Sequence, residues 1–241
     1  NFLIKLLTQG VICHPQKYMR KSHSPILCPL PSTVQGYIYN ILSCYTNQMN
    51  TFYLIRHGKT LNNEAGRLSG WVDTPLTPDG LELTQKAIKK LTGVNFDYIY
   101  SSDLGRAFIT AYVTAQALAP SVAIVPLAGL REVNYGDAGN MPTSEAYALF
   151  PLLDRDTDFT PPNGESLKDM QARVIKTIFQ INADRTDANI LLVAHSGVMA
   201  ALVAYKEGLD FGQHNISEAY DHDTVLRFTI AGDQIASLQK L

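Results

Sequence analysis

Short apolar runs recur along the chain from residue 51 onward, each of a length suited to a strand. They cover residues 51–55, 96–100, 122–126 and 190–194. The first run, Thr-Phe-Tyr-Leu-Ile, is rich in β-branched and aromatic residues, which favours a buried strand. The last run, Ile-Leu-Leu-Val-Ala, contains no polar residue and is also expected to be buried. Residues 224–230 and 234–238 flank Gly232-Asp233, a pattern that predicts a β-hairpin.

Amphipathic segments separate these runs. Helices are expected at about 77–93, 104–118, 165–183 and 197–206. At the first of these, Thr77-Pro78-Asp79 supplies an N-cap, a proline at the first helical position and an acidic first turn, and Gly93 ends the helix. The longest helix has five apolar residues at helical spacing, namely Leu167, Met170, Val174, Ile178 and Ile181. Residues 133–163 are expected to be mostly irregular, with one short helix near 143–150.

Alternation of strands and helices predicts an α/β fold. We expect a three-layer αβα arrangement with a mostly parallel central sheet and helices on both faces. The 241 residues suffice for one such domain with a sizeable core, and the 46% hydrophobic content is typical of a globular protein.

Residue composition changes sharply near Met49. Residues 1–48 contain four basic residues, no Asp or Glu, and all three cysteines of the chain. The remaining residues carry 16 basic and 22 acidic side chains, a net charge of −6, and no cysteine. We therefore predict two parts, a leader at 1–48 that is not a domain and a single folded domain at 49–241.

Three interpretations of the leader stay open. Its strongest apolar run, residues 2–13, is interrupted by Lys5 and is too short to span a bilayer. The segment is a targeting peptide, since transit sequences lack acidic residues, or a genuine extension, or translated upstream sequence with Met49 as the start. We favour the third interpretation because the chain begins with Asn rather than Met. The three cysteines lack metal-ligand spacing and support neither a disulfide framework nor a zinc site.

Overall charge argues against two classes of partner. The chain has a net charge of −2 and a pI near 6.3, whereas proteins that bind nucleic acid or anionic membranes usually present a basic face. We therefore expect no nucleic-acid partner and no membrane partner. A domain without cysteine is compatible with a cytoplasmic location.

Two histidines occupy equivalent places in the pattern. His57 and His195 each follow an apolar strand and precede a turn into a helix. Because the carboxyl ends of the strands in an open α/β sheet form the binding crevice, both imidazoles are expected at the same edge. Taken alone, each is better explained as a strand-end histidine with an ordinary hydrogen bond.

Two arginines change this interpretation. Arg56 adjoins His57, and Arg106 is expected in the first turn of the helix that follows the strand at 96–100. Two guanidiniums and two imidazoles at one edge would repel each other unless an anion lay between them. The planar fork of arginine matches phosphate oxygens, and the N-terminus of the helix that carries Arg106 would add backbone N–H donors. We therefore expect a phosphoryl group at this edge.

Five motifs in chain order resemble those of the histidine phosphatase superfamily, the group that contains the cofactor-dependent phosphoglycerate mutases. The motifs are Leu54–Thr60 with Asn63, Ser101–Ala107, Leu130–Glu132, Gly164–Ser166 and Ala194-His195. In that order they are similar to the family's R-H-G-x-[ST] signature, its second phosphate arginine, its acid motif, the start of its long helix and its second histidine. The resemblance covers nearly all of residues 51–200 and is to the broad-specificity phosphatase branch.

The resemblance implies a role for each matched residue. His57 would be the nucleophile that attacks phosphorus, and Glu132 would be the general acid that protonates the leaving oxygen. The equatorial oxygens would be held by Arg56, Asn63, Arg106 and His195. Further substrate contacts would come from Thr60, Ser69, Gly70, Ser196 and Gly197. No metal or other cofactor is implied, since phosphoryl transfer depends mainly on positioning and charge neutralisation.

Several residues keep simpler explanations. Glu132 is alternatively a surface carboxylate, and Trp71 is either a substrate contact, as its place in the family pattern implies, or a packing residue. Lys59 and Arg67 either add positive charge at the mouth of the site or are merely solvated. Four other histidines lack metal-ligand spacing and are expected to have no role in the site, namely His14, His23, His214 and His222.

The acidic segment at 133–163 favours hydrolysis over transfer to a second substrate. It contains five carboxylates and a single arginine, Arg155, so it would close poorly around a polyanion, whereas the family's mutases use a long basic excursion there. We therefore expect a phosphomonoesterase, monomeric or homodimeric, that acts on small phosphorylated metabolites through a phosphohistidine on His57. The alternatives are a cofactor-dependent phosphoglycerate mutase and a catalytically silent phosphate-binding module.

Overall fold

The fold is built on one six-stranded sheet. The structure is a computed structural model that describes residues 49–209, 211, 220–232 and 234–241, all of which belong to one unit at 46–241. The leader predicted at 1–48 lies outside the described residues, and so do His14, His23 and His214. No helix in the described ranges is long and apolar enough to cross a membrane.

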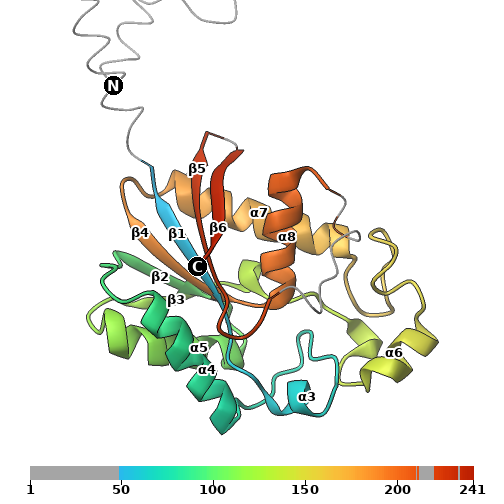
Figure 1. Cartoon of the computed structure of the whole chain (residues 1–241). Helices are drawn as coiled ribbons and strands as arrows, with labels where there is room; N and C mark the ends of the chain where they lie inside the picture. Colours follow the sequence, from blue (N-terminus) through green and yellow to red (C-terminus); the bar gives the residue numbers. More distant parts are fainter. Residues whose placement is uncertain (1–48, 210, 212–219, 233) are drawn as a thin grey trace, which may run out of the picture. The chain divides into compact units, whose positions relative to one another are not determined.

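Four parallel strands and one antiparallel hairpin make up the sheet. The strands are β1 (Thr51–Arg56), β2 (Tyr98–Ser101), β3 (Ile124–Pro126), β4 (Asn189–Ala194), β5 (Val225–Ala231) and β6 (Gln234–Lys240). Their spatial order is β3-β2-β4-β1-β5-β6. β1 to β4 run parallel to one another, and β5 and β6 are antiparallel to their neighbours. Figure 1 shows β5 and β6 side by side, as the predicted hairpin requires.

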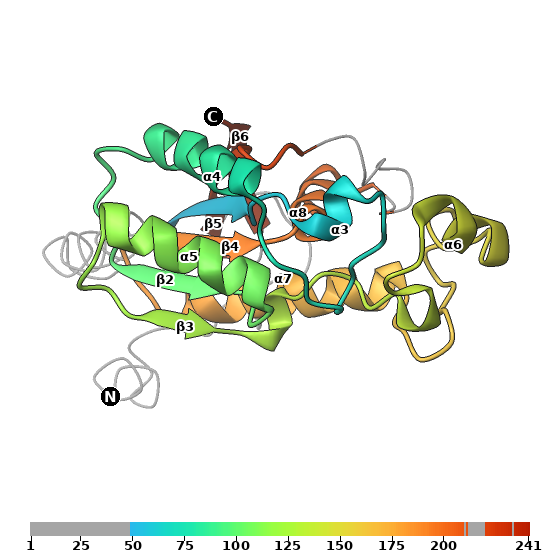
Figure 2. The ribbon, with the colours of Figure 1, turned by 90° about the horizontal axis from the view of Figure 1, so that it is seen from below.

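Helices cover both faces of the sheet. They are α3 (Leu61–Glu64), α4 (Pro78–Lys90), α5 (Gly105–Leu118), α6 (Thr143–Leu149), α7 (Leu167–Ala183) and α8 (Ser196–Glu207), with 3-10 turns at Ala128–Leu130 and Gly136–Ala138. α4 and α5 lie on one side of the strands and α7 and α8 on the other (Figure 1), which confirms the three-layer prediction. Figure 2 shows α6 beyond one end of the sheet.

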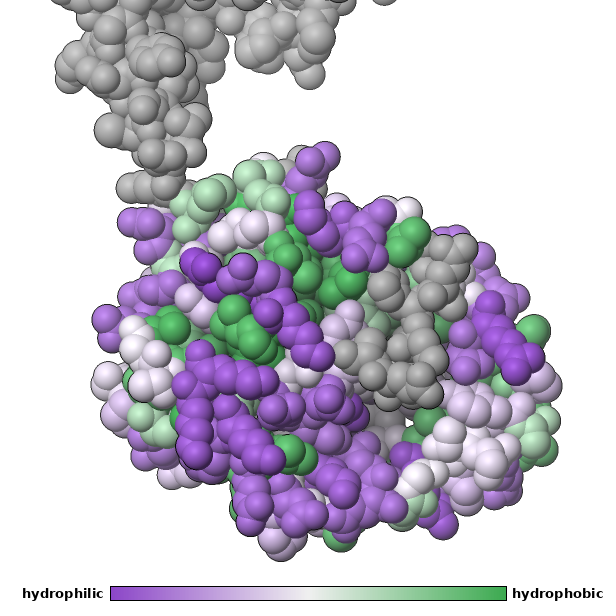
Figure 3. Space-filling model, in the orientation of Figure 1, coloured by the Kyte–Doolittle hydropathy of each residue, from purple (hydrophilic) through white to green (hydrophobic). Residues whose placement is uncertain are grey.

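Alternation along β1 divides the interior into two cores. Phe52 and Leu54 pack with the apolar faces of α7 and α8, whereas Tyr53 and Ile55 pack with α5 and the end of α4. Successive side chains of a strand point to opposite faces, so a wholly apolar strand supplies both cores at once. A smaller cluster around Ala146 anchors α6. The outer surface of α4 is hydrophilic, as its amphipathic sequence predicts (Figure 3).

Local capping residues fix where the helices begin. The Thr77 side chain accepts a hydrogen bond from Gly80 N at 3.0 Å, with Pro78 at the first position of α4, as predicted. Ser166 caps α7 in the same way by accepting from Asp169 N. The segment at 133–163 contains α6 and one 3-10 turn and is otherwise irregular, which confirms that prediction.

Candidate active site

The two strand-end histidines meet at one edge of the sheet. β1 and β4 are parallel neighbours with Arg56 opposite Ala194, so the residue that follows each strand emerges beside the other. The ring centroids of His57 and His195 are 5.1 Å apart. Both rings are buried, with 4% and 0% of each residue exposed. The structure therefore brings both imidazoles within reach of one phosphoryl group.

Hydrogen bonding fixes the tautomer of His57. Its Nδ1 lies 2.7 Å from Gly58 O, and because a carbonyl only accepts, Nδ1 carries the proton. The lone pair is therefore on Nε2, which accepts a hydrogen bond from Arg106 Nε at 3.3 Å. Burial lowers the pKa of His57 well below its usual value, and Arg106 and His195 lower this pKa further. A neutral imidazole with its lone pair directed at a phosphate-binding group is a competent nucleophile at pH 7.

Arg106 is held in a single orientation. It lies in the first turn of α5 and is 1% exposed. Its guanidinium donates to Val72 O at 3.0 Å and to Gly70 O at 2.6 Å. Gly70 has a φ of 51°, and a Cβ there would lie 2.9 Å from Val133 O, so glycine permits this turn. Gly70, predicted as a substrate contact, thus acts through the Arg106 guanidinium in this structure.

The N-terminus of α5 corrects one expectation. The backbone N–H groups of Gly105 and Arg106 donate to the carboxylate of Asp73, which also lies 3.6 Å from the Arg106 guanidinium. Leu104, at the N-cap position, offers no side-chain cap. Asp73 therefore takes the place that the sequence assigned to phosphate at this helix end. Arg106 contributes its side chain to the site rather than its backbone.

Several polar atoms around the histidines are buried without a partner. Four such side-chain atoms occur among the described residues: Arg56 Nε, Ser69 Oγ, His195 Nδ1 and Thr224 Oγ1. The first three belong to residues predicted to contact phosphate, and buried polar groups normally find a partner. The other side of the His195 ring is occupied, because its Nε2 lies 2.8 Å from Ser102 Oγ. An oxyanion would satisfy the unpaired donors.

Glu132 is a buried carboxyl and not a surface one. It is 8% exposed, and its Oε2 accepts from Gly197 N at 3.1 Å and from Ser196 Oγ at 3.4 Å. Oε1 accepts from Val133 N at 3.0 Å. A Cβ on Gly197 would lie 2.0 Å from Glu132 Oε1, so only glycine admits the carboxyl here. Ser196 and Gly197, predicted as substrate contacts, thus hold Glu132 at the N-terminus of α8.

Thr60 and Asn63 form a capping box at α3. Thr60 Oγ1 accepts from Asn63 N, while Asn63 Oδ1 accepts from Thr60 N at 3.0 Å. The Thr60 hydroxyl also donates to Asn63 Oδ1 at 2.9 Å. The backbone N–H and the hydroxyl of Thr60 are therefore both used in the cap of α3, and its contact with substrate stays a prediction. The Asn63 amide NH₂ is the group of this pair left to serve phosphate.

The other candidate side chains at the mouth are tied to neighbours. Trp71 donates from Nε1 to Glu132 O at 2.8 Å, and the Arg131 guanidinium lies 4.6 Å from its ring. Lys59 pairs with Glu64 at 3.5 Å. Arg67 donates to the backbone carbonyl of Asn140. Trp71 thus supports the acid loop, which favours its simpler explanation.

His222 is the site residue that sequence reasoning missed. Its Nδ1 lies 2.7 Å from His57 O and its ring centroid lies 5.5 Å from that of His57. Burial and the Arg56 charge lower the pKa of His222 to about 4, so the ring is neutral at pH 7. The signal for it is topological, since Val225 at the start of antiparallel β5 pairs with Ile55 near the end of β1.

Segment 220–222 supports the Arg56-His57 pair at two points. Arg56 donates to Tyr220 O at 2.7 Å, and His222 donates to the carbonyl of His57. No group of three His, Cys, Asp or Glu within the described ranges is arranged to hold a metal ion. Among the described residues, the site thus combines cationic and neutral donors around His57 with two carboxyls, Glu132 and, against Arg106, Asp73.

Known proteins are similar to the chain over most of its length. Residues 52–239 match the model of the histidine phosphatase superfamily (branch 1). Identity is 32% over 197 residues to a 2,3-bisphosphoglycerate-dependent phosphoglycerate mutase of Bartonella tribocorum, covering 78% of this chain and 95% of that protein. Identity to the adenosylcobalamin/alpha-ribazole phosphatase of Escherichia coli is 33% over 162 residues, covering 65% of this chain and 79% of that protein. The solved structure of Bacillus stearothermophilus YhfR aligns with a TM-score of 0.70 at 27% identity, covering 77% and 94%. The chain therefore belongs to branch 1 of the histidine phosphatase superfamily.

Proposed function

We propose that the protein is a phosphomonoesterase that hydrolyses small phosphorylated metabolites through a phosphohistidine on His57. The observation that carries the proposal is the Nε2 lone pair of His57, held 3.3 Å from the Arg106 guanidinium and beside the unpaired donors of Arg56 and His195. This arrangement suits a nucleophile whose target carries negative charge on several oxygens.

The first half-reaction forms the phosphoenzyme. His57 Nε2 attacks phosphorus, the P–N bond forms and the P–O ester bond breaks. Arg56 and Arg106 neutralise the charge on the equatorial oxygens, while the neutral His195, Asn63 and Ser69 supply hydrogen bonds. Glu132, protonated at this stage, gives its proton to the leaving oxygen, which departs as the alcohol.

The second half-reaction releases phosphate. A water molecule attacks the phosphohistidine, and the Glu132 carboxylate formed in the first step accepts its proton. The P–N bond breaks, inorganic phosphate leaves and His57 returns to its neutral form. Glu132 thus ends the cycle protonated, as it began, and no group outside the chain is consumed.

Charge pairing around the site supports hydrolysis over mutase activity. A mutase must bind a second anionic group of its substrate near the phosphohistidine. Among the described residues, Lys59 faces Glu64 and Arg131 forms a two-point ion pair with Asp103 at 2.6 Å. These cations already have anionic partners, and the segment at 133–163 adds five carboxylates and one arginine. The site thus favours a substrate with one phosphate.

A phosphoglycerate mutase remains the second candidate. The 32% identity to the Bartonella tribocorum enzyme, covering 95% of its length, favours it. The similarity to a phosphatase that acts on alpha-ribazole phosphate is of the same order. Only the rates of phosphate release and of phosphate transfer distinguish the two.

The full chain should release phosphate from p-nitrophenyl phosphate in the presence of a chelator and should be inhibited by vanadate. Acid-labile labelling of the protein by phosphate should disappear in His57→Asn. His195→Asn, as the matched control, should be labelled more slowly but to the same extent. Labelling of His57→Asn at the wild-type level would contradict the proposal. Interconversion of phosphoglycerates faster than phosphate release would favour the mutase.

A further inference from the structure

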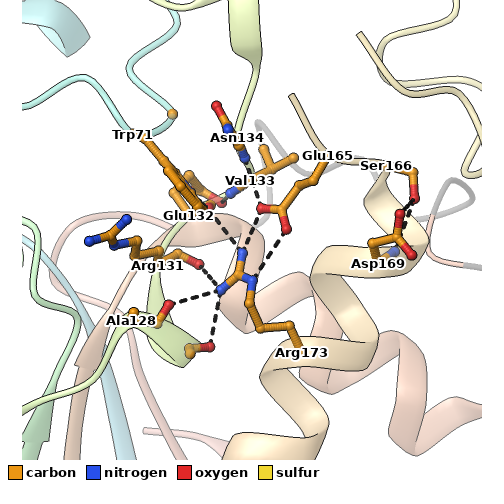
Figure 4. A network of polar contacts seen from close by, with 12 residues as sticks. Trp71, Ala128, Arg131, Glu132, Val133, Asn134, Glu165, Ser166, Asp169 and Arg173 are labelled. Carbon is orange, nitrogen blue, oxygen red and sulfur yellow. Dashed lines mark hydrogen bonds and ion pairs between the residues drawn. The ribbon is translucent and has the colours of Figure 1, made fainter. Parts of the chain in front are cut away.

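Arg173 on α7 binds the backbone that leads up to the proposed catalytic acid, Glu132. Its guanidinium lies between four carbonyl oxygens, as Figure 4 shows. The acceptors are Ala128 O at 3.3 Å, Gly129 O at 3.1 Å, Arg131 O at 3.1 Å and Glu132 O at 3.3 Å. One rigid cation therefore holds the five-residue stretch that ends in Glu132.

Glu165 extends these contacts to the residues that follow Glu132. It forms a two-point pair with Arg173, with Oε1 and Oε2 at 2.6 and 3.2 Å from the guanidinium nitrogens. The same Oε1 accepts from Asn134 N at 2.9 Å. Because Asn134 lies two residues after Glu132, the pair fixes the chain before and after the acid. Planar two-point contacts of this kind define geometry as well as add stability.

The acid loop is held by individual contacts rather than by regular secondary structure, and those from Trp71, Gly197 and Asp103 add to those from Arg173. Residues 128–130 form a single 3-10 turn, and residues 131–134 belong to no helix or strand. A Cβ on Gly129 would lie 2.0 Å from Thr177 Oγ1, so glycine allows this turn to approach α7 closely. That close approach brings the carbonyls within reach of Arg173. Glycine and arginine thus act together to dock the loop on α7.

We infer that Arg173, with Glu165, is a positioning pair that sets the Glu132 carboxyl in place for proton transfer. Neither residue touches the reacting atoms. The inference rests on the proposed function, because it matters only if Glu132 protonates the leaving oxygen. It adds that α7 holds the backbone of the acid loop, while Ser196 and Gly197 at the start of α8 contact the Glu132 carboxyl itself.

The test uses the dependence of rate on the leaving group. A poor leaving group such as an alkoxide needs a placed proton, whereas p-nitrophenolate does not. Arg173→Met in the full chain should lower kcat/KM for an alkyl phosphate by about 10- to 100-fold and that for p-nitrophenyl phosphate by less than about 3-fold. kcat/KM is the appropriate quantity because it reports phosphohistidine formation, whichever half-reaction limits kcat.

Conservative variants separate geometry from charge and from folding. Arg173→Lys keeps the positive charge but cannot reach the same set of oxygens, so it should show the same selectivity as Arg173→Met. Glu165→Gln should show the same selectivity for the alkyl phosphate, but to a smaller extent. Lys176→Met, an exposed charge one turn away on α7, is the matched control and should behave as wild type. Unchanged inhibition by vanadate will show that the phosphate pocket is intact.

Combination with Glu132→Gln distinguishes the two possible failures. If Arg173 acts through the acid, Arg173→Met should add no selectivity to Glu132→Gln. Full additivity, equal slowing of both substrates, or recovery of wild-type rates in Arg173→Lys would each overturn the inference and leave the proposed function standing. Glu132→Gln itself should slow the alkyl phosphate more than p-nitrophenyl phosphate. If it slows both substrates equally, Glu132 is not the acid of the proposed mechanism.

Discussion

Three imidazole rings lie close together at the nucleophile, and they differ in how deeply they are buried. His195 is fully buried, His57 is nearly so, and His222 is partly exposed. His222 donates to the carbonyl of His57, while the His57 ring itself donates to the next carbonyl along the chain. The turn that aims the nucleophile therefore depends on two imidazole N–H groups, one of them from a distant segment.

Removal of the His222 ring should loosen this turn. His222→Ala leaves the buried carbonyl of His57 without a donor, which corresponds to about 1 kcal/mol or more and so to a loss of about 10-fold in phosphohistidine formation. His222→Asn keeps an N–H donor and should recover most of that rate. A single-turnover labelling experiment measures both. Equal rates for the two variants would show that the hydrogen bond is unimportant.

At the residue scale, sequence reasoning identified the groups that belong to motifs and missed those that act through tertiary contacts. His57, His195 and Glu132 stand in recognisable local patterns. Asp73 and His222 do not, because what matters about each is the distant residue it touches. Thr60 shows the converse, since a residue inside a motif is used up by its own helix cap.

Helix ends decide much of the local electrostatics. The N-terminus of α5 is capped by Asp73 across a gap of more than thirty residues, because Leu104 has no side-chain acceptor. The N-terminus of α8 instead receives Glu132. Both ends thus bind carboxylates of the protein, and the phosphate site relies on side-chain donors.

Asp73 variants should separate the cap from the charge. Asp73→Ala removes both and should lower the free energy of unfolding by about 1 kcal/mol. Asp73→Asn keeps an acceptor and should be nearly as stable as wild type. Both remove a negative charge facing Arg106, so vanadate should bind about 2- to 5-fold more tightly, and less so at high salt.

Thr77→Ala is the matched control for this pair, because Thr77 caps α4 by the same kind of bond. It should show the same loss in urea denaturation as Asp73→Ala, with unchanged vanadate affinity. Tighter vanadate binding in Thr77→Ala would mean that loosening any helix alters the site, and the charge argument would be wrong.

Long elements could be predicted from the sequence, whereas single turns could not. α4 and α7 have side-chain N-caps and an apolar stripe, and the sequence predicts the limits of α4, α5, α7 and α8 to within a few residues. α3 and the 3-10 turn at Ala128–Leu130 are too short for any period to show. α3 is fixed by the local capping box between Thr60 and Asn63, and the 3-10 turn is fixed by the distant Arg173.

The whole molecule should be less stable in acid. The pKa values of His57 and His195 lie well below the ordinary value of 6.5, and that of His222 lies at about 4. Below about pH 6.5 the unfolded chain therefore binds protons that the folded protein does not, and stability falls as pH falls. Between about pH 7.5 and about pH 5 the loss should be about 2 kcal/mol or more.

Urea titrations in a buffer without phosphate can measure this loss. His222→Asn has no imidazole to titrate at that position, so its stability should depend less steeply on pH than that of the wild type. A slope as steep as that of the wild type would exclude His222 as a contributor. A wild-type stability independent of pH from about 5 to about 7.5 would refute the linkage as a whole.

At the scale of the molecule, fold class followed from the sequence but strand order did not. Alternation of strands and helices is sufficient to predict layers. It does not say that β4 lies between β2 and β1, or that β5 pairs beside β1. Without that order, the proximity of His222 to His57 could not be derived.

The central position of β1 has a consequence for how the chain is made. Both strands that flank it, β4 and β5, follow it by more than 130 residues, so Thr51–Arg56 stays without its neighbours while those residues are made. Contacts of such long sequence separation form slowly, and an unpaired run of Phe, Tyr, Leu and Ile on a nascent chain is prone to aggregate. The strand that presents the nucleophile therefore stays exposed on the nascent chain until β4 and β5 have been synthesised.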